Sequence, residues 1–248
     1  MAVINLSPES RNRHSVAADA ASALAMAHRY RDAGATIIDL GGQSSHFENP
    51  TISAATEIER LLPAVAALAE AGFVISVDTW KPEVAAACVA AGAAIVNDTG
   101  GLTDPAMIGI VAGSQAAAVM VYVDGENPHA VGTVDHGPDK AARTAMILQE
   151  RLEALSGAGV ADVIIDPGIA LNYRGDYERY TQLQLEVIRE SASLHTLGHP
   201  VMIPIPRKKE EHRVMAYITL ALEYGADLIR VHDVEAACDL VRLLGRMP

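Results

Sequence analysis

One pattern recurs along the chain and restricts its fold more than any other feature. A helix-like run ends in Ala-Gly or Tyr-Gly, and a short apolar run follows at once, in AGATIIDL, AGFVISVD, AGAAIVND, AGVADVIID and YGADLIRV. Glycine just beyond a helix end supplies the left-handed residue that closes the helix, and the glycines at 34, 72, 92 and 225 fit this role. Short runs rich in Val and Ile are typical of strands buried on both faces. The alternation predicts parallel strands joined by right-handed crossovers.

Eight apolar runs are predicted as strands, and they are spread over the whole chain. They are 2–6, 36–42, 74–80, 94–100, 117–125, 163–168, 200–205 and 227–234. Helix-like segments lie at 17–33, 55–71, 82–91, 138–157, 177–194, 209–224 and 234–245. Eight strands in 248 residues, without a GxGxxG loop after the first, favour an α/β fold of the (β/α)₈ TIM barrel type over an open doubly wound sheet. No linker or low-complexity tract is visible in the sequence, so 1–248 is predicted to be a single domain.

Composition argues against two classes of partner and predicts a compartment. The 31 acidic and 19 basic residues give a formal net charge of −12, which disfavours nucleic acid or an anionic membrane surface as the main partner. The chain begins MAVINLSPES, without a charged leader before an apolar core, and no apolar run approaches the roughly 20 residues of a membrane span. We therefore expect a cytoplasmic protein. Cys88 and Cys238 lie in Ala-rich helical patterns, where buried reduced thiols are expected.

Polar side chains lie at the ends of nearly all the predicted strands. They are Asn5, Asp39, Asp78, Asn97, Asp98, Tyr122, Asp124, Asp166, Arg207, Lys208, Arg230, His232 and Asp233. In a barrel the carboxyl ends of all strands meet on one face, where the active site lies. An Asp at a strand end is also a common cap for the next helix, and this alternative stays open for Asp39, Asp98 and Asp233. Polar residues at so many strand ends nevertheless predict one shared site.

One part of this set suits a flat heterocycle. Asp78, Asn97 and Asp166 offer carboxylate and amide groups, which pair well with the N–H and C=O edges of such a ring. These three residues come from three different predicted strands. They are therefore expected to form the floor of a pocket.

The other part suits an oxyanion. Lys208, Arg230 and His232 offer positive charge to a phosphate or a similar group. Asn5 could add an oxygen ligand for Mg²⁺, which favours oxygen atoms and substrate phosphates. A pterin that carries a diphosphate would use both parts of the site.

Six segments, in order along the chain, resemble the motifs of the dihydropteroate synthase family. INLSPES, IIDLGGQSS, VIIDPGIA and IPRKK lie where that family has N-x-T-P-D-S, I-D-x-G-G-E-S-T-R, D-P-G-x-G and S-R-K. ISVDTWKPEVAAACVAAGAAIVND resembles its third and fourth strands, and IRVHDV its eighth. The likeness covers nearly the whole chain. It implies a magnesium-dependent, homodimeric transferase of folate biosynthesis, in which the amine of p-aminobenzoate displaces diphosphate from a pterin methylene carbon.

The resemblance also implies roles for individual residues. The pterin-binding set comprises Asp78, Asn97, Asp166, Lys208 and Arg230. The phosphate-binding set comprises Asn5, His46, Arg230 and His232, of which Asn5 is also the metal contact. The residues implied for catalysis, which acts through positioning and stabilisation of the leaving group, are Asn5, Lys208, Arg230 and His232.

Departures from the family motifs concern mainly the second substrate. Arg11 takes the place of a first-loop aromatic residue, and Pro206 replaces the serine of S-R-K. His46 replaces a second-loop arginine and would be a weaker anion ligand, because imidazole is mostly neutral near pH 7. Other loop residues such as Phe47 or Tyr173 could supply the contacts instead. We expect ordinary synthase activity to be poor and place the altered second-substrate loops at Arg11, Ser45, Leu171 and Pro206.

Two other functions stay open. A related barrel that moves a one-carbon unit from a folate would also use an Asp and Asn floor, but such methyltransferases do not resemble the N-x-S-P-E-S start or the R-V-H-D ending of this chain. A non-catalytic paralogue would bind a pterin as a carrier or a regulator. Mass spectrometry of a retained ligand would identify a pterin binder, and an assay of diphosphate release would then separate a transferase from a carrier.

Overall fold

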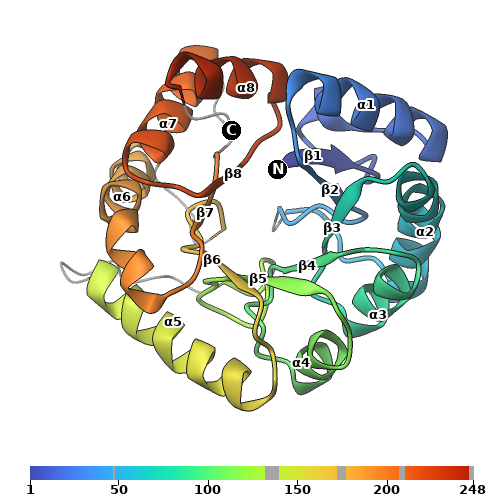
Figure 1. The fold of residues 1–248 in the computed structure, drawn as a ribbon, viewed down its shortest axis with the longest axis horizontal. Helices are drawn as coiled ribbons and strands as arrows, with labels where there is room; N and C mark the ends of the chain where they lie inside the picture. The colour runs from blue at the N-terminus through green and yellow to red at the C-terminus, as the bar shows by residue number, and fades with distance from the viewer. Residues whose placement is uncertain (47, 132–139, 172–176, 207–209, 246–248) are drawn as a thin grey trace.

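The computed structural model describes residues 1–46, 48–131, 140–171, 177–206 and 210–245, and within them strands form an inner ring surrounded by helices (Figure 1). The strands are β1 (Ala2–Asn5), β2 (Ile37–Gly41), β3 (Val74–Asp78), β4 (Ile95–Asp98), β5 (Ala117–Val121), β6 (Val163–Asp166), β7 (Met202–Pro204) and β8 (Leu228–Arg230). All eight predicted strands are confirmed. Each is shorter than the apolar run that predicted it, because the polar residues that follow several of them belong to the loops.

The helices are α1 (Ala20–Ala33), α2 (Ala54–Glu70), α3 (Pro82–Ala90), α4 (Pro105–Ala112), α5 (Lys140–Gly157), α6 (Tyr177–Glu190), α7 (Glu211–Glu223) and α8 (Val234–Leu243), with 3-10 turns η1 (Arg13–Ser15) and η2 (Ser191–Leu197). The sequence analysis did not predict α4, a short apolar helix capped by the Asp104 side chain. The four predicted helix-closing glycines all have positive φ angles, from 74° to 122°.

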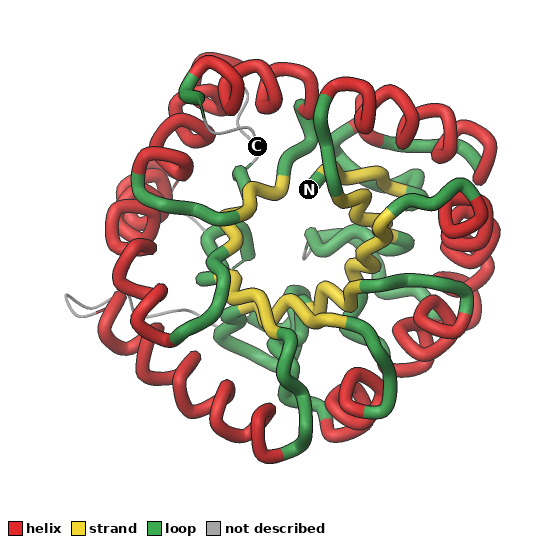
Figure 2. The backbone as a smooth tube through the Cα atoms, viewed as in Figure 1, coloured by secondary structure: helices red, strands yellow, loops and turns green. Residues whose placement is uncertain are grey.

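The ring of strands is closed. Strands β1 to β6 pair in parallel and in order, and β7 pairs with β8. Main-chain hydrogen bonds join the two sheets on both sides, from Val3 N to Val231 O at 3.0 Å and from Ile165 N to Pro200 O at 2.8 Å. Figure 2 shows the resulting circle of strands. The open doubly wound sheet is therefore excluded.

The inward-facing side chains of the strands form two layers in the barrel interior, one apolar and one polar. Apolar side chains fill the end where the strands begin, with a cluster made up of Met1, Ile95, Val119, Val121 and Met202. Alternate residues of a strand share a face, so Asn97 stands two positions beyond Ile95 and Arg230 two positions beyond Leu228 on the same side. Polar groups therefore collect at the carboxyl ends, while the apolar layer beneath them closes the interior.

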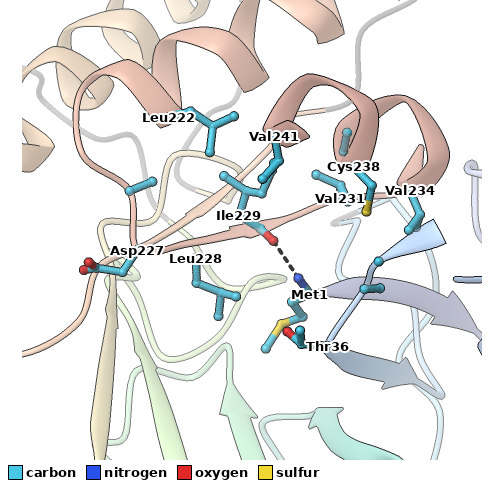
Figure 3. A pocket seen from close by; sticks show the side chains of 14 residues that line it. Met1, Thr36, Leu222, Asp227, Leu228, Ile229, Val231, Val234, Cys238 and Val241 are labelled. Carbon is cyan, nitrogen blue, oxygen red and sulfur yellow. Dashed lines mark hydrogen bonds between the residues drawn. The ribbon is translucent and has the colours of Figure 1, made fainter. Parts of the chain in front are cut away.

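A separate, mostly apolar cavity of about 440 Å³ lies near the opposite end of the barrel. Its walls come from α8, the end of α7 and the segments that start β2 and β8, and Figure 3 shows Thr36, Leu228, Cys238 and Val241 around it. Cys88 is buried as predicted, but the prediction is wrong for Cys238, which is partly exposed because it lines this cavity; both thiols are free. Burial raises the pKa of Cys88 to about 12, so its thiol is unreactive at neutral pH.

None of the described helices has both the length and the apolar character that a membrane span requires.

Candidate active site

A cavity of about 470 Å³ lies at the carboxyl ends of the strands. Its lining includes Asn5, Ser10, Arg11, Asn12, Gln43, Ser44, Ser45, His46, Asp78, Leu171, Pro206, Arg230 and His232. These residues follow or end six different strands, as expected for a barrel site. An adjoining cleft of about 740 Å³ shares Arg11, Asn12, Ile205, Pro206 and His232 with it.

Arg230 ties the floor of this cavity together. Its Nε donates to Asp39 Oδ2 at 2.8 Å, and its Nη2 donates to Asp78 Oδ2 at 2.6 Å. Ser76 Oγ donates to Asp39 Oδ1 at 2.6 Å, and Asn97 Nδ2 lies 3.4 Å from both oxygens of that carboxylate. Asp39 is fully buried, and the Arg230 side chain is 17% exposed, so Arg230 and Asp78 are the members of the network that reach the cavity.

Burial controls the protonation of the acids around Arg230. It raises the pKa of Asp166 to about 7, although the Gly168 N–H and the charge of Arg230 both lower it. It also raises the pKa of Asp78, against the opposing effect of Arg230. For Arg230 the desolvation that would lower its pKa is outweighed by the charges of Asp39 and Asp78, so its pKa is raised and it stays charged. The floor thus holds a fixed cation beside carboxyls that can change their protonation near neutral pH.

Asn97 and Asp166 lie deeper than the cavity lining. Asn97 is 1% exposed and Asp166 is 4% exposed. Asp166 Oδ1 accepts a hydrogen bond of 2.7 Å from Gly168 N. Asn97 Oδ1 is buried and has no hydrogen-bond partner among the described residues. A buried acceptor without a partner costs about 1–3 kcal/mol, which a ligand donor could offset.

A second network joins the first loop to the end of β8. His232 Nε2 lies 2.8 Å from Asn12 Nδ2, and His232 Nδ1 lies 3.0 Å from Ser15 Oγ. Asn5 Nδ2 donates to the same Ser15 oxygen at 2.9 Å. Asn5 and His232, both predicted to hold the diphosphate, are therefore linked through one serine.

The loop after β2 is anchored by a partly buried lysine. Lys81 Nζ donates to Gln43 Oε1 at 2.5 Å, to Ile52 O at 2.8 Å and to Glu57 Oε2 at 2.6 Å. Gln43 Oε1 also accepts from Ile52 N at 3.1 Å. These bonds hold Gln43 in the cavity wall, next to Ser44 and Ser45.

Arg11 and Glu48 form an exposed ion pair between the first and second loops. Arg11 lines both the cavity and the adjoining cleft. The cavity mouth therefore carries a charged pair at the position where the family motif has an aromatic residue.

The structure brings most of the predicted site residues together. Those that line the cavity are Asn5, Arg11, Ser45, His46, Asp78, Leu171, Pro206, Arg230 and His232. Asn97 and Asp166 lie behind its floor, and Lys208 lies outside the described residues, as do Arg207, Phe47 and Tyr173.

The helix-cap interpretation is correct for one of the three aspartates to which it applied. Asp233 caps α8 through a hydrogen bond from Ala236 N at 3.4 Å. Asp98 closes its own loop instead, by accepting from Gly100 N at 2.7 Å and Leu102 N at 2.9 Å. For Asp39 it is wrong, because both carboxylate oxygens are engaged inside the barrel, with Ser76 and Arg230.

The predicted sets missed the loop residues Asn12, Ser15 and Gln43, and they included Asp39 as a strand-end residue without giving it a part in binding. Asp39 stands two positions before Gly41 on β2 and pairs in register with Ser76, which places it inside the barrel. Asn12, Ser15 and Gln43 lie in loops, and no periodic pattern marks loop side chains. Among the described residues there is no group of three or more His, Cys, Asp or Glu side chains able to hold a metal.

Comparisons with the sequences of known proteins all match one family. The family model described as pterin binding enzyme matches residues 1–242. A dihydropteroate synthase of Streptococcus pyogenes is 30% identical, over 100% of this chain and 94% of its own length. One from a Synechocystis strain is 28% identical, over 98% and 88%.

Solved structures give the same result. The dihydropteroate synthase of Thermus thermophilus in complex with 4-aminobenzoate is 29% identical, with a TM-score of 0.84 over 100% of this chain and 93% of that one. The Yersinia pestis enzyme in a sulfonamide complex is 26% identical, with a TM-score of 0.85 over 99% and 93%. The chain thus shares the fold of these proteins over nearly its whole length.

Proposed function

The chain belongs to the family of pterin-binding enzymes, and from this premise we propose that it joins a pterin methylene diphosphate to an amine and releases diphosphate. The dihydropteroate synthase names of the relatives support a transferase over a folate-dependent methyltransferase. This proposal includes three parts: a pterin as the bound ring, the roles of the individual site residues, and the identity of the amine.

The observation that carries the proposal is the Arg230 network at the cavity floor. A pterin edge presents N–H donors next to a carbonyl acceptor, and such an edge needs carboxylate, amide and cationic partners together. Asp78 and Arg230 offer these groups at the surface of the cavity, and the unpaired Asn97 Oδ1 offers an acceptor behind it. Asp166 completes the floor as a further carboxyl, with Lys208 as the remaining member of the proposed ring-binding set.

The diphosphate end of the substrate is assigned to the opposite part of the cavity. Asn5 and His232 line it together with His46 from the second loop. His46 offers an imidazole where the family motif has an arginine, so we propose that it binds the anion more weakly. Arg230 adds a fixed charge between the two ends of the substrate.

The residues present fit Mg²⁺ only as an ion that arrives with substrate. Asn5 Nδ2 is committed to Ser15, which leaves Oδ1 as the ligand atom. Mg²⁺ is commonly held by one or two protein oxygens, substrate phosphates and water, and the described residues hold no carboxylate cluster for it. The ion would supply charge for the leaving diphosphate.

The proposed reaction is a displacement at carbon. The amine nitrogen forms a bond to the pterin methylene carbon, the bond from that carbon to the diphosphate oxygen breaks, and the oxygen keeps the electron pair. The amine nitrogen then loses one proton to water. Asp78 and Arg230 orient the ring, while Asn5 and His232 hold the leaving group, so the chain acts by positioning and charge.

We further propose that the second-substrate site is altered. Arg11 brings its ion pair with Glu48 to the mouth, and Pro206 lacks both a hydroxyl and a main-chain donor. Leu171 and Ser45 complete this side of the cavity. An aniline ring would therefore contact the charged Arg11 in place of an aromatic residue, and the rigid ring of Pro206 in place of a serine.

A homodimer, implied by the family resemblance, is also proposed. Light scattering of the purified protein after size-exclusion chromatography would measure its mass. A mass near that of the 26.2 kDa chain would exclude the dimer under those conditions.

The test of the function follows diphosphate release. Purified protein receives 6-hydroxymethyl-7,8-dihydropterin diphosphate, Mg²⁺ and one of several aryl or alkyl amines, and mass spectrometry identifies the conjugate. Amine-dependent release of diphosphate is expected, and Asp78→Asn and Arg230→Met should abolish it. Pterin binding without release for any amine would favour the non-catalytic paralogue, and methyl transfer from a folate would favour the methyltransferase.

A further inference from the structure

Ser15 lies where the first loop meets both β1 and the end of β8. Its side chain is fully buried in η1. Its Oγ accepts from Asn5 Nδ2 at 2.9 Å, lies 3.0 Å from His232 Nδ1, and donates to the main-chain oxygen of Asn12 at 3.0 Å. One hydroxyl therefore contacts the two residues proposed to hold the diphosphate.

These contacts select one protonation form of His232. A hydroxyl carries a single hydrogen, and a carbonyl oxygen can only accept it. With that hydrogen directed to Asn12 O, the Ser15 oxygen must accept from His232, so Nδ1 carries the proton. Nε2 then accepts from the side-chain amide of Asn12, 2.8 Å away. In that arrangement each of the four contacts joins one donor to one acceptor.

The same hydroxyl fixes the amide of Asn5. Because Nδ2 donates to Ser15, Oδ1 is turned the other way, over Gly41, where a β-carbon would come within 3.5 Å of it. An amide without the Ser15 contact could present either its oxygen or its nitrogen to the cavity.

We propose that Ser15 is a positioning residue for the diphosphate end of the substrate. Through one oxygen it turns Asn5 Oδ1 towards the cavity and keeps the His232 ring in a single orientation, with Nε2 beside Asn12. To hold the diphosphate, Nε2 takes up a proton and donates to the anion in place of its contact with Asn12. This inference rests on the proposed function and deepens it, because it explains how two residues from opposite ends of the chain are aligned before the substrate binds.

The first test needs no substrate. Nitrogen-15 NMR of the imidazole groups, with the His232 signals identified by their loss in His232→Gln, reports which nitrogen carries the proton. The wild type and Ser15→Thr should show the Nδ1–H form, and Ser15→Ala should show a mixture. An Nε2–H form in the wild type, or an unchanged spectrum in Ser15→Ala, would overturn the proposal. Ser193→Ala, which removes an exposed hydroxyl in η2 that bonds only main chain, is the matched control.

The second test measures binding of inorganic diphosphate with Mg²⁺ by calorimetry. Ser15→Ala should weaken it about tenfold, the value of one hydrogen bond to a charged group, while Ser15→Thr and Ser193→Ala stay near the wild type. Affinity for 6-hydroxymethylpterin, which lacks the diphosphate, should not change. Equal diphosphate affinity in Ser15→Ala would reject the positioning role. If the wild type binds no diphosphate, the proposed function fails, and the NMR comparison still decides the role of Ser15.

Discussion

Arg230 is the residue whose environment departs most from that of an ordinary side chain. Its guanidinium lies between two buried carboxylates, with a third acid, Asp166, close enough to raise its pKa further. Buried ion pairs of this kind add little net stability when intact, because desolvation offsets the attraction. Removing one partner is costly, since the other charge stays buried. The intact arrangement is therefore not expected to be a main source of stability, and its proposed role is ligand recognition.

Replacing Arg230 with methionine should reveal this cost. Asp39 would keep a buried carboxylate without its cation, so Arg230→Met should lower the free energy of unfolding at pH 7 by about 3–5 kcal/mol. Urea denaturation measures the change. Arg29→Met is the control, because Arg29 and Glu235 form a pair that is more than half exposed, and such pairs contribute about 1 kcal/mol or less. Similar losses in the two variants would contradict the cost expected from leaving the Asp39 carboxylate buried without its cation.

Asp166 should make stability depend on pH in a defined direction. Burial raises its pKa in the folded protein to about 7, whereas an unfolded Asp titrates near 4. Between these values the folded state binds more protons than the unfolded state, so the stability that this group contributes is complete below pH ~4 and is lost as pH rises towards 7.

Asp166→Asn should remove that dependence while Asn keeps an acceptor for Gly168 N. Relative to the wild type, the variant should gain stability between pH 4 and 7, by up to a few kcal/mol, because one pKa unit corresponds to about 1.4 kcal/mol. Thermal and urea unfolding across this range would measure the difference. Parallel pH profiles for the two proteins would show that the Asp166 carboxyl is not shifted.

At the scale of elements, one of the glycines that follow a helix does more than end the helix. Gly72 and Gly92 occupy equivalent places, after α2 and α3, with φ angles of 74° and 110°. A β-carbon at Gly72 would meet nothing within 4 Å, whereas one at Gly92 would lie 2.8 Å from Ala69 Cβ. The second glycine thus also permits the close approach of neighbouring helices.

The two glycines therefore form a matched pair for substitution by alanine. Gly72→Ala should cost about 1–2 kcal/mol, from backbone strain alone. Gly92→Ala should cost more, because the methyl group of Ala69 cannot rotate away and the backbone must move. Chemical denaturation of both variants measures the difference. Gly72→Ala costing as much as Gly92→Ala would show that the contact with Ala69 is unimportant.

The sequence predicted regular elements better than loop geometry, for physical reasons. Strands buried on both faces and glycine-ended helices have periodic signals, and these gave all eight strands. The short helix α4 was missed because its apolar run lacks a polar face, and such a run does not distinguish a helix from a buried strand. Strand ends gave Asp78 and Arg230, but the partnership of Arg230 with Asp39 joins residues 191 apart in the chain. That pairing depends on barrel closure, which no local pattern contains.

At the scale of the molecule, closure places the first and last strands side by side. Asn5 and Ser15 from the start of the chain therefore meet His232 from its end. The chain carries a formal net charge of −12, yet Arg11 and Arg230 line this one cavity. Both arginines are paired with carboxylates, Arg11 with Glu48 and Arg230 with Asp39 and Asp78. The site can therefore form only when the barrel is closed, because closure brings its residues from the two ends of the chain together.

The altered second-substrate loops should lower the rate at which the protein uses p-aminobenzoate. We expect low turnover with p-aminobenzoate, because Arg11 and Pro206 lie where the family motifs have an aromatic residue and a serine. The double variant Arg11→Phe, Pro206→Ser should raise kcat/KM for p-aminobenzoate at least about tenfold, which corresponds to roughly 1.4 kcal/mol of transition-state binding. Arg11→Met, Pro206→Ala is the control, since it removes the charge and the rigid ring without adding an aromatic group or a hydroxyl. Wild-type turnover equal to that of the related synthases, or rescue of a strain that lacks its own synthase, would show that the present loops already accept p-aminobenzoate.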